Sequence, residues 1–290
     1  MIPDTSRLST QTHPAPPLTV RGRTFEWGTR TYLMAIVNVT PDSFSGDGLN
    51  DDIAAAAVLA RQFEREGADI IDVGAESTRP NADPITPAEE TARALPAIRA
   101  IRKVVDLPIS IDTQHAQVAE AALESGADIV NDINGLRGDP GMASIVASRG
   151  CALVAMHNQR GRKPGDVVTN TLSGWKESLR IAEKAGILRD QIIVDPGFGF
   201  GWTPEENLQL VQRLDELLIS NLPLLLGPSR KSTLGLILDS AVEDRLEGTS
   251  ATVAIAIAKG VDIVRVHDIA EVRKVAAVAD AISRGRWQSP

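Results

Sequence analysis

The chain has 290 residues, of which 43% are hydrophobic and 23% charged, a balance that permits one sizeable core. Its net charge of −8 argues against a nucleic-acid-binding body, and its single cysteine, Cys151, excludes a disulfide within the chain. The longest apolar run is far shorter than the roughly 20 residues that a membrane span takes, and the N-terminus lacks the charged and apolar regions of a secretory signal. We therefore expect a cytoplasmic protein with neither a nucleic-acid nor a membrane partner.

Residues 1–18 are rich in Pro, Ser and Thr and are expected to form a loose N-terminal tail, followed by a single domain over 19–290. Short apolar runs then alternate with stretches rich in Ala, Leu, Glu and Arg, of which 52–67 is the clearest helix. Nearly every residue of these runs is apolar, as in parallel strands buried on both faces. The eight strands expected are Tyr32–Val39, Ile70–Val73, Ile109–Ile111, Ile129–Asp132, Ala152–Met156, Ile192–Val194, Leu224–Leu226 and Ile263–Val266.

A weak internal repeat supports a closed architecture. The same plan occurs in EGADIIDVG (66–74), SGADIVNDI (125–133) and KGVDIVRVH (259–267). In each, a glycine ends a helix, the chain turns, and a strand starts with Asp-Ile. Three such corners among eight strand–helix units favour an α/β fold, a single (β/α)₈ TIM barrel. A doubly wound open sheet is the alternative.

Polar side chains follow the expected strands, where a barrel of this kind carries its active site. One of these stretches, GPSRKSTLG (227–235), has Arg230 rather than Gly before Lys231, and Gly227 stands four rather than six positions before that lysine. It therefore departs from the Walker A pattern of phosphate-binding loops. The other polar positions at strand ends are Asn38, Asp112, Asn131, Asp195, Arg265 and His267.

Eight stretches together give the chain a resemblance to the dihydropteroate synthase family from about residue 30 to 282. They are NVTPDSFS (38–45), DVGAESTRP (72–80), SIDT (110–113), NDINGL (131–136), DPGFGFG (195–201), GPSRKSTLG (227–235), RLEGTSATVAIAIAKG (245–260) and VRVHD (264–268). The resemblance implies a TIM barrel that joins (7,8-dihydropterin-6-yl)methyl diphosphate to 4-aminobenzoate, releasing pyrophosphate and forming 7,8-dihydropteroate.

The resemblance also implies a site for each part of the reaction. Asp195 is the expected acceptor for adjacent N–H donors of the pterin edge, a pairing that suits a carboxylate. The diphosphate is expected on Arg265 and His267, with Mg²⁺ carried by the substrate and facing Asn38. The pterin set is Asp112, Asn131, Met156, Asp195, Phe200 and Lys231. The 4-aminobenzoate set is Phe44, Thr78, Arg79, Pro80 and Ser229, and the catalytic set is Asn38, Lys231, Arg265 and His267.

The family mechanism is a dissociative substitution that needs no protein nucleophile, so neither Cys151 nor any serine is assigned that role. His13, His115 and His157 show no metal-ligand spacing in the sequence, and no zinc site is expected from them. Four acidic residues are expected to be structural or supporting: Asp72, Glu76, Asp132 and Asp268.

Two other functions share parts of this pattern. A methyltransferase that moves methyl groups from folate to a corrinoid protein shares the Asp and Asn pterin contacts but does not need the SRKS or STRP stretches. A non-catalytic pterin-binding paralogue is supported only by departures in loops 41–50 and 79–87, such as Asn81 where glycine is usual. The family also implies a homodimer, for which the helix near 249–258 is one candidate surface.

Overall fold

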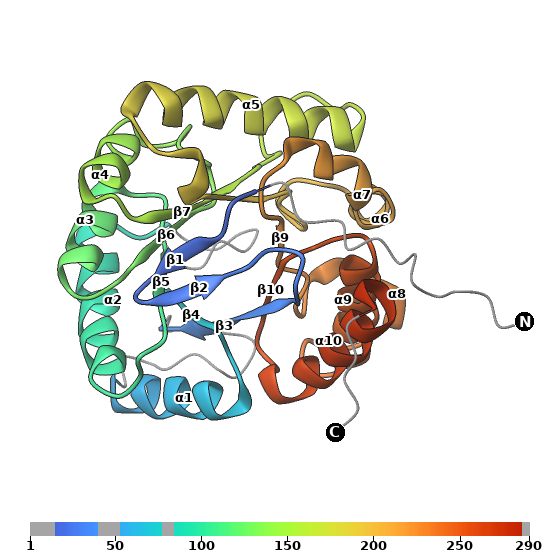
Figure 1. The fold of residues 1–290 in the computed structure, drawn as a ribbon, viewed down its shortest axis with the longest axis horizontal. Helices are drawn as coiled ribbons and strands as arrows, with labels where there is room; N and C mark the ends of the chain where they lie inside the picture. The colour runs from blue at the N-terminus through green and yellow to red at the C-terminus, as the bar shows by residue number, and fades with distance from the viewer. Residues whose placement is uncertain (1–14, 40–52, 77–83, 286–290) are drawn as a thin grey trace, which may run out of the picture.

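Eight parallel strands form the centre of the computed structural model, which describes residues 15–39, 53–76 and 84–285 (Figure 1). Every neighbouring pair in the sheet is parallel, in the order β8-β7-β6-β5-β4-β3-β10-β9. The strands are β3 (Tyr32–Asn38), β4 (Ile70–Gly74), β5 (Ile109–Asp112), β6 (Ile129–Asp132), β7 (Ala152–Met156), β8 (Ile192–Asp195), β9 (Leu225–Leu226) and β10 (Ile263–Val266).

The two edges of this sheet meet. A parallel bridge joins Val194 of β8 to Leu224, just before β9, and the Val194 N–H donates to the Pro223 carbonyl at 2.9 Å. The sheet is therefore a nearly closed barrel, which confirms the (β/α)₈ prediction and excludes the open doubly wound sheet. The strand boundaries differ from those expected by no more than one residue at either end.

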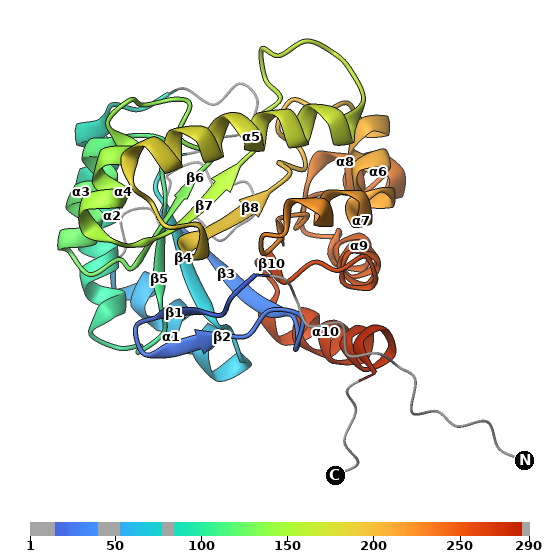
Figure 2. The same cartoon turned by 45° about the horizontal axis from the view of Figure 1, so that its top comes forward.

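Helices surround the barrel and cover its outer face (Figures 1 and 2). Local sequence explains several of their ends: Thr86 and Thr203 cap α2 and α6 with a glutamate three residues later, and Asp166 caps α5. The helices are α1 (Ile53–Glu66), α2 (Pro87–Arg102), α3 (Ala116–Glu124), α4 (Met142–Arg149), α5 (Val167–Ala185), α6 (Pro204–Gln212), α7 (Leu214–Leu217), α8 (Ser232–Leu238), α9 (Leu246–Ala258) and α10 (Ile269–Arg284), with 3₁₀ turns at Arg189–Gln191 and Leu218–Ser220. In the described residues, none of these helices is long and apolar enough to cross a bilayer.

A short antiparallel hairpin lies across the amino-terminal end of the barrel, formed by β1 (Leu18–Val20) and β2 (Arg23–Phe25) (Figure 2). Phe25 packs against Trp27 and Tyr32 with ring centroids 5.8 and 4.9 Å apart. The sequence analysis anticipated neither strand, because three residues are too few for an alternation to be recognised. Since β1 begins at Leu18, the boundary expected between residues 18 and 19 falls inside this strand; residues 1–14 lie outside the described structure.

The barrel interior below the site is solid. Side chains from seven of the eight strands fill it together with the hairpin, and each is at most 3% exposed: Met34, Ile70, Ile129, Ala152, Val154, Ile193, Leu225 and Ile263. A second and larger apolar cluster lies between the strands and the surrounding helices. Polar side chains are thereby left to the carboxyl end of the strands.

Candidate functional site

The register of the strands aligns polar residues at the carboxyl end of the barrel. Asn38 lies opposite Gly74, Gly74 opposite Asp112, and Asp112 opposite Asn131 across β3 to β6. Asp195 ends β8 on the far side of the same rim. Positions that are distant in the sequence are therefore at one level of the barrel, where their side chains can share one ligand.

Arg265 lies at the centre of this group. Its Nε donates to Asp72 Oδ2 and its Nη2 to Asp112 Oδ2, both at 2.6 Å. Asn131 Nδ2 lies 3.4 and 3.5 Å from the two carboxylate oxygens of Asp72. Asp72 is fully buried, so an aspartate that was expected only to support the structure fixes the position of a site residue.

Two carboxylates share this one guanidinium, and the arrangement affects the pKa values of Asp112 and Arg265. Burial raises the pKa of Asp112 to about 7, although Arg265 opposes the shift and the Asp72 carboxylate adds to it. Burial lowers the pKa of Arg265, but the two carboxylates outweigh this effect and hold that pKa above its ordinary value. The group can therefore take up a proton near neutral pH, at Asp112.

Asp195 is buried at the end of β8, and its side chain is held by the turn that follows. Its Oδ1 accepts the Gly197 N–H at 2.7 Å, while its backbone carbonyl accepts from Trp175 Nε1 at 3.1 Å and from the His157 N–H at 2.8 Å. Burial raises the pKa of this carboxyl to about 6, against the opposing effect of the Gly197 hydrogen bond. A ligand that donates N–H groups to Asp195 would restore its ordinary preference for the charged form.

Lys231 and Phe200 meet on one side of the site. The Lys231 Nζ lies 4.2 Å from the centre of the Phe200 ring, and the Arg160 guanidinium lies 5.0 Å from the same ring. Burial, with a smaller contribution from Arg265, lowers the pKa of Lys231 to about 8. This lysine is therefore charged at neutral pH and loses its charge under mildly alkaline conditions.

Asn207 of α6 ties these two residues together, a role that the sequence analysis did not detect. Its Oδ1 accepts the Gly199 N–H at 2.7 Å, and its Nδ2 donates to Thr233 Oγ1 of α8 at 3.1 Å. The loop that carries Phe200 is thus joined to the first turn of the helix that Lys231 precedes. Asn207 stands among other polar residues of α6, so the sequence does not show that its side chain is the buried one.

Ser229 and His267 form a pair at the ends of β9 and β10. Ser229 Oγ lies 2.9 Å from His267 Nδ1 and accepts the His267 backbone N–H at 3.3 Å. Arg230, the next residue, has a φ of 56°, which turns the chain sharply between Ser229 and Lys231 just after β9. Its Nη2 donates to Asp268 Oδ1 at 2.6 Å. The pair offers hydroxyl and imidazole groups beside Arg265.

The remaining expected residues divide into two groups. Asn38 and Met156 lie at the carboxyl ends of β3 and β7, and Met156 is 3% exposed. The structure thus brings to this rim Asn38, Asp112, Asn131, Met156, Asp195, Phe200, Ser229, Lys231, Arg265 and His267. The other expected site residues lie outside the described residues: Phe44, Thr78, Arg79 and Pro80. The same is true of His13, for which no role in the site was expected.

A second polar group lies beside the site. Glu76, Glu90 and His115 each offer one ligand atom, and these atoms all lie within 4.8 Å of one another, close enough to hold one metal ion. The spacing of histidines in the sequence gave no sign of this group, because its members come from the end of β4, from α2 and from the turn after β5.

Comparisons with known proteins agree with this geometry. Residues 34–267 match the family described as pterin binding enzyme. The chain is 43% identical over 277 residues to the dihydropteroate synthase of Synechocystis, covering 93% of this chain and 96% of that protein. A dihydropteroate synthase structure from Clostridium difficile, determined in the presence of pteroic acid, has 45% identity and a TM-score of 0.85, covering 90% of this chain and 99% of that one.

A third comparison, with a Xanthomonas albilineans dihydropteroate synthase bound to 4-aminobenzoic acid, gives 37% identity and a TM-score of 0.86, over 92% of this chain and 98% of the other. The family match over residues 34–267 includes every site residue described above. The resemblance found in the sequence is confirmed, and the chain belongs to the pterin-binding enzymes and, among them, to the dihydropteroate synthases, which are transferases.

Proposed function

We propose that this barrel joins (7,8-dihydropterin-6-yl)methyl diphosphate to 4-aminobenzoate, giving 7,8-dihydropteroate and pyrophosphate, a step of folate biosynthesis. The observation that carries the proposal is the meeting of Asp195, Lys231 and the Asp72–Arg265–Asp112 group at one end of a barrel whose relatives are dihydropteroate synthases. Acidic acceptors for a pterin and cationic donors for a diphosphate are thereby present in one place.

The pterin would lie on the acidic side of the site. Asp195 accepts two adjacent N–H donors from the ring edge, and such paired, charge-assisted hydrogen bonds are strong and directional. Asp112 and Asn131 contact other polar atoms of the edge, and Lys231 donates to a ring acceptor. Met156 and Phe200 supply apolar surface for the faces of the ring, as is usual in pockets for small planar ligands.

The diphosphate would lie beside Arg265 and His267. Within the described residues, Asp72 and Asp112 engage two of the five N–H donors of Arg265, so that other donors stay available to an anion. The contact between His267 Nδ1 and Ser229 Oγ fixes the orientation of the imidazole ring beside Arg265. Placing fixed donors where charge develops on the leaving group stabilises the transition state.

Asn38 fits a substrate-borne Mg²⁺. Asn38 ends β3 at the rim beside Gly74, and its Oδ1 lies 3.4 Å from where a Cβ at Gly74 would stand. Oxygen ligands suit Mg²⁺, which binds proteins through few side chains and through substrate phosphates. When bound, the ion would neutralise charge on the diphosphate; Asn38 is the residue that would hold it.

The acceptor would bind over the pterin, with its carboxylate at Ser229. The Xanthomonas albilineans relative, whose structure contains 4-aminobenzoic acid, supports this class of acceptor. Phe44, Thr78, Arg79 and Pro80 are proposed to complete that part of the site, although they lie outside the described residues. The chain then positions the amine to attack as the C–O bond to the diphosphate breaks, and no protein nucleophile takes part.

We further propose that the protein works in the cytoplasm as a homodimer. The exposed apolar side chains on α8, α9 and α10 support the dimer.

Release of pyrophosphate tests the activity directly. The purified chain is mixed with the dihydropterin diphosphate and Mg²⁺, with and without 4-aminobenzoate. We expect release that depends on the acceptor, with dihydropteroate as the product. Pterin binding without pyrophosphate release would instead indicate the non-catalytic paralogue. Methyl transfer from folate to a corrinoid protein would indicate the methyltransferase.

A matched pair of variants tests the pterin pocket. Asp195→Asn keeps the shape of the side chain but removes the charged acceptor, and should weaken pterin binding about 30-fold, the equivalent of ~2 kcal/mol. Asp190→Asn, at an exposed position remote from the site, is the control and should bind as the parent does. Unchanged binding in Asp195→Asn would contradict the pocket assignment.

A further inference from the structure

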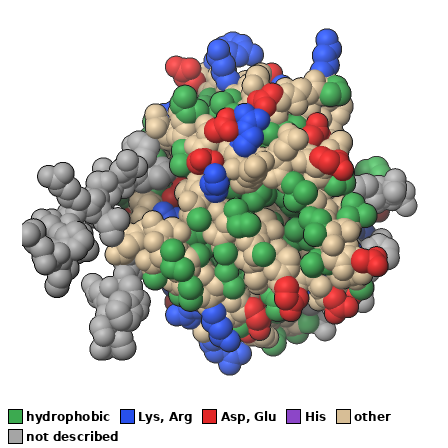
Figure 3. Space-filling model, turned by 90° about the vertical axis from the view of Figure 1, so that its right-hand side faces the viewer, with side chains coloured by type: hydrophobic (Ala, Val, Ile, Leu, Met, Phe, Trp, Pro, Cys, Tyr) green, Lys and Arg blue, Asp and Glu red, His purple; other side chains and the backbone are tan. Residues whose placement is uncertain are grey.

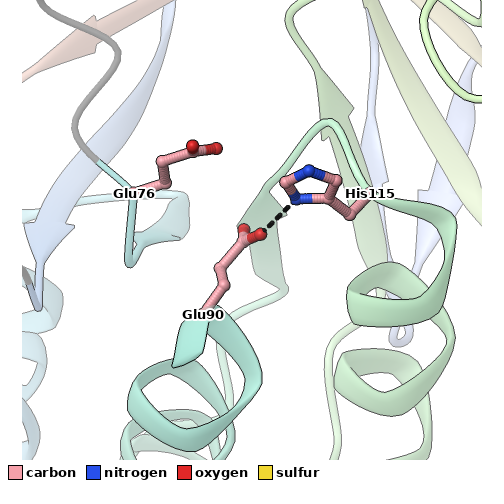
Figure 4. A group of neighbouring side chains, drawn as sticks. All are labelled: Glu76, Glu90 and His115. Atoms are coloured by element: carbon pink, nitrogen blue, oxygen red, sulfur yellow. Dashed lines mark hydrogen bonds and ion pairs between the residues drawn. The ribbon is translucent and has the colours of Figure 1, made fainter. Parts of the chain in front are cut away.

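Glu76, Glu90 and His115 converge on one point beside the carboxyl end of β5 (Figure 4). Glu76 follows β4, Glu90 rises from α2, and His115 precedes α3. Figure 4 shows the Glu90 carboxylate between the other two side chains. None of these residues is needed for the reaction proposed above, so the group calls for a separate explanation.

The chemistry of the group is that of a metal site. His115 Nδ1 lies 2.7 Å from Glu90 Oε2, and Gln114 Nε2 donates to Glu76 Oε2 at 3.1 Å, which orients the second carboxylate. Hydrogen bonds of this kind to a ligand's other oxygen are what hold metal ligands in place. One imidazole and two carboxylates thus face a single point, with Glu76 partly exposed on the open side.

Glu90 provides the independent observation. Its side chain is fully buried, and its Oε1 has no hydrogen-bond partner within the described part of the chain. Burial raises the pKa of Glu90; hydrogen bonds from His115 and the Thr113 hydroxyl oppose this shift, and the like-charged Glu76 adds to it. A buried carboxylate oxygen without a partner is unfavourable unless a cation or donor reaches it.

We propose that Glu76, Glu90 and His115 bind one divalent transition-metal ion, for which Zn²⁺ is the best match. Zinc takes imidazole nitrogen and carboxylate oxygen at about 2.0–2.2 Å, which places neighbouring ligand atoms roughly 3.4 Å apart. The three ligand atoms lie within 4.8 Å of one another, so small side-chain rotations suffice to reach that arrangement. A water molecule completes four-coordination.

This site is distinct from the proposed Mg²⁺ position. Mg²⁺ prefers oxygen ligands and seldom binds imidazole, and Asn38, the residue proposed for it, offers an amide oxygen. An ion held by Glu76, Glu90 and His115 would join the end of β4 to α2 and to the start of α3. It would therefore fasten together three elements around the strand that carries Asp112, without touching the reacting atoms.

Metal binding by the purified, untagged full chain tests the proposal. Zn²⁺ affinity and stoichiometry are measured by competition with a chromophoric chelator, and Co²⁺ is used as a spectroscopic probe because its visible absorption reports the coordination geometry. We expect one ion per chain. His115→Gln and Glu90→Gln should each weaken binding by at least ~100-fold and abolish the Co²⁺ spectrum.

The control is Glu120→Gln, which changes an exposed glutamate on α3 outside the group and should bind Zn²⁺ like the parent. Thermal unfolding without metal checks that each variant is folded; if Glu90→Gln is not, the partly exposed Glu76→Gln takes its place. Absence of Zn²⁺ binding by the parent chain would overturn the proposal, as would unchanged binding by His115→Gln, which would put the ion elsewhere.

Discussion

Asp195 and Lys231 have opposite charges when ionised, and burial moves both pKa values toward neutrality. The carboxyl has a pKa of about 6 and the lysine one of about 8, so both are charged only in the window between. Asp112, with a pKa of about 7, adds a third group that changes charge in the same range. The site is therefore tuned to bind its pterin near pH 7.

Pterin affinity should depend on pH at both limits. Because Asp112 and Asp195 must both lose a proton to accept the ring's N–H groups, affinity should fall about tenfold between pH 7 and 6 and approach a loss of about a hundredfold per unit below pH 6. Above pH 8 it should fall again as Lys231 loses its charge. Calorimetric titration with the dihydropterin alcohol from pH 5 to 9 measures both limbs.

Lys231→Arg is the informative variant for this profile. Arginine stays charged over the whole range, so the alkaline fall should disappear while the acid fall stays where it was. An alkaline limb that persists in this variant would assign it to the ligand or to another residue.

Some of these residues could be predicted from the sequence and others could not. Asp112, Asn131 and Asp195 stand directly at the ends of apolar runs, so barrel topology alone places them together. Asp72 lies within a strand, and its partner Arg265 is 193 residues away, so only the folded barrel shows their contact. The pairing of His115 with Glu90 was hidden for the same reason.

At the scale of elements, the β8–α6 turn depends on Gly197. Its φ is 74°, and a Cβ there would lie 1.9 Å from the His157 carbonyl oxygen. No side chain fits without moving the backbone of a neighbouring strand end. The Gly197 N–H also holds the Asp195 carboxylate, so the geometry of this turn and that of the pterin acceptor are set together.

Gly197→Ala should lower the free energy of unfolding by at least ~3 kcal/mol and weaken pterin binding, since steric overlap adds to backbone strain. Gly186→Ala is the matched control: its φ is 85°, but nothing lies within 4 Å of the added methyl group. It should lose only about 1 kcal/mol and bind normally. Chemical denaturation and calorimetry measure both; similar losses in the two variants would refute the steric explanation.

Element type could be predicted wherever the local pattern was long enough. The eight barrel strands are continuous apolar runs because both of their faces are buried, and this is the simplest strand signal in a sequence. The strands β1 and β2 have three residues each and form only because the barrel end offers apolar surface to cover. That surface does not exist until the barrel has folded.

At the scale of the molecule, α8, α9 and α10 present apolar side chains to solvent. Figure 3 shows hydrophobic side chains gathered on this face, which is the right-hand side of Figure 1. The exposed residues on these helices are Leu236, Ile237, Leu238, Ile255, Val278 and Ile282, with exposed fractions from 42% to 78%. Large apolar patches on a protein surface mark interaction sites, which supports the proposed homodimer.

Val278→Glu should therefore convert a dimer into a monomer, because an unpaired charge in an apolar interface is strongly unfavourable and should raise the dissociation constant at least ~100-fold. Sedimentation velocity across a concentration series measures the change. Leu188→Glu, at an exposed apolar position outside these helices, is the control and should leave the mass unchanged. A monomeric parent chain would contradict the dimer itself.

The hairpin of β1 and β2 and the packed layer of side chains above it close the amino-terminal end of the barrel, so the site opens only at the carboxyl end of the strands. No passage runs through the described interior, so substrates and products must use the same opening. Pyrophosphate and dihydropteroate then compete with the next substrates for the space they vacate. Turnover should accordingly slow as products accumulate.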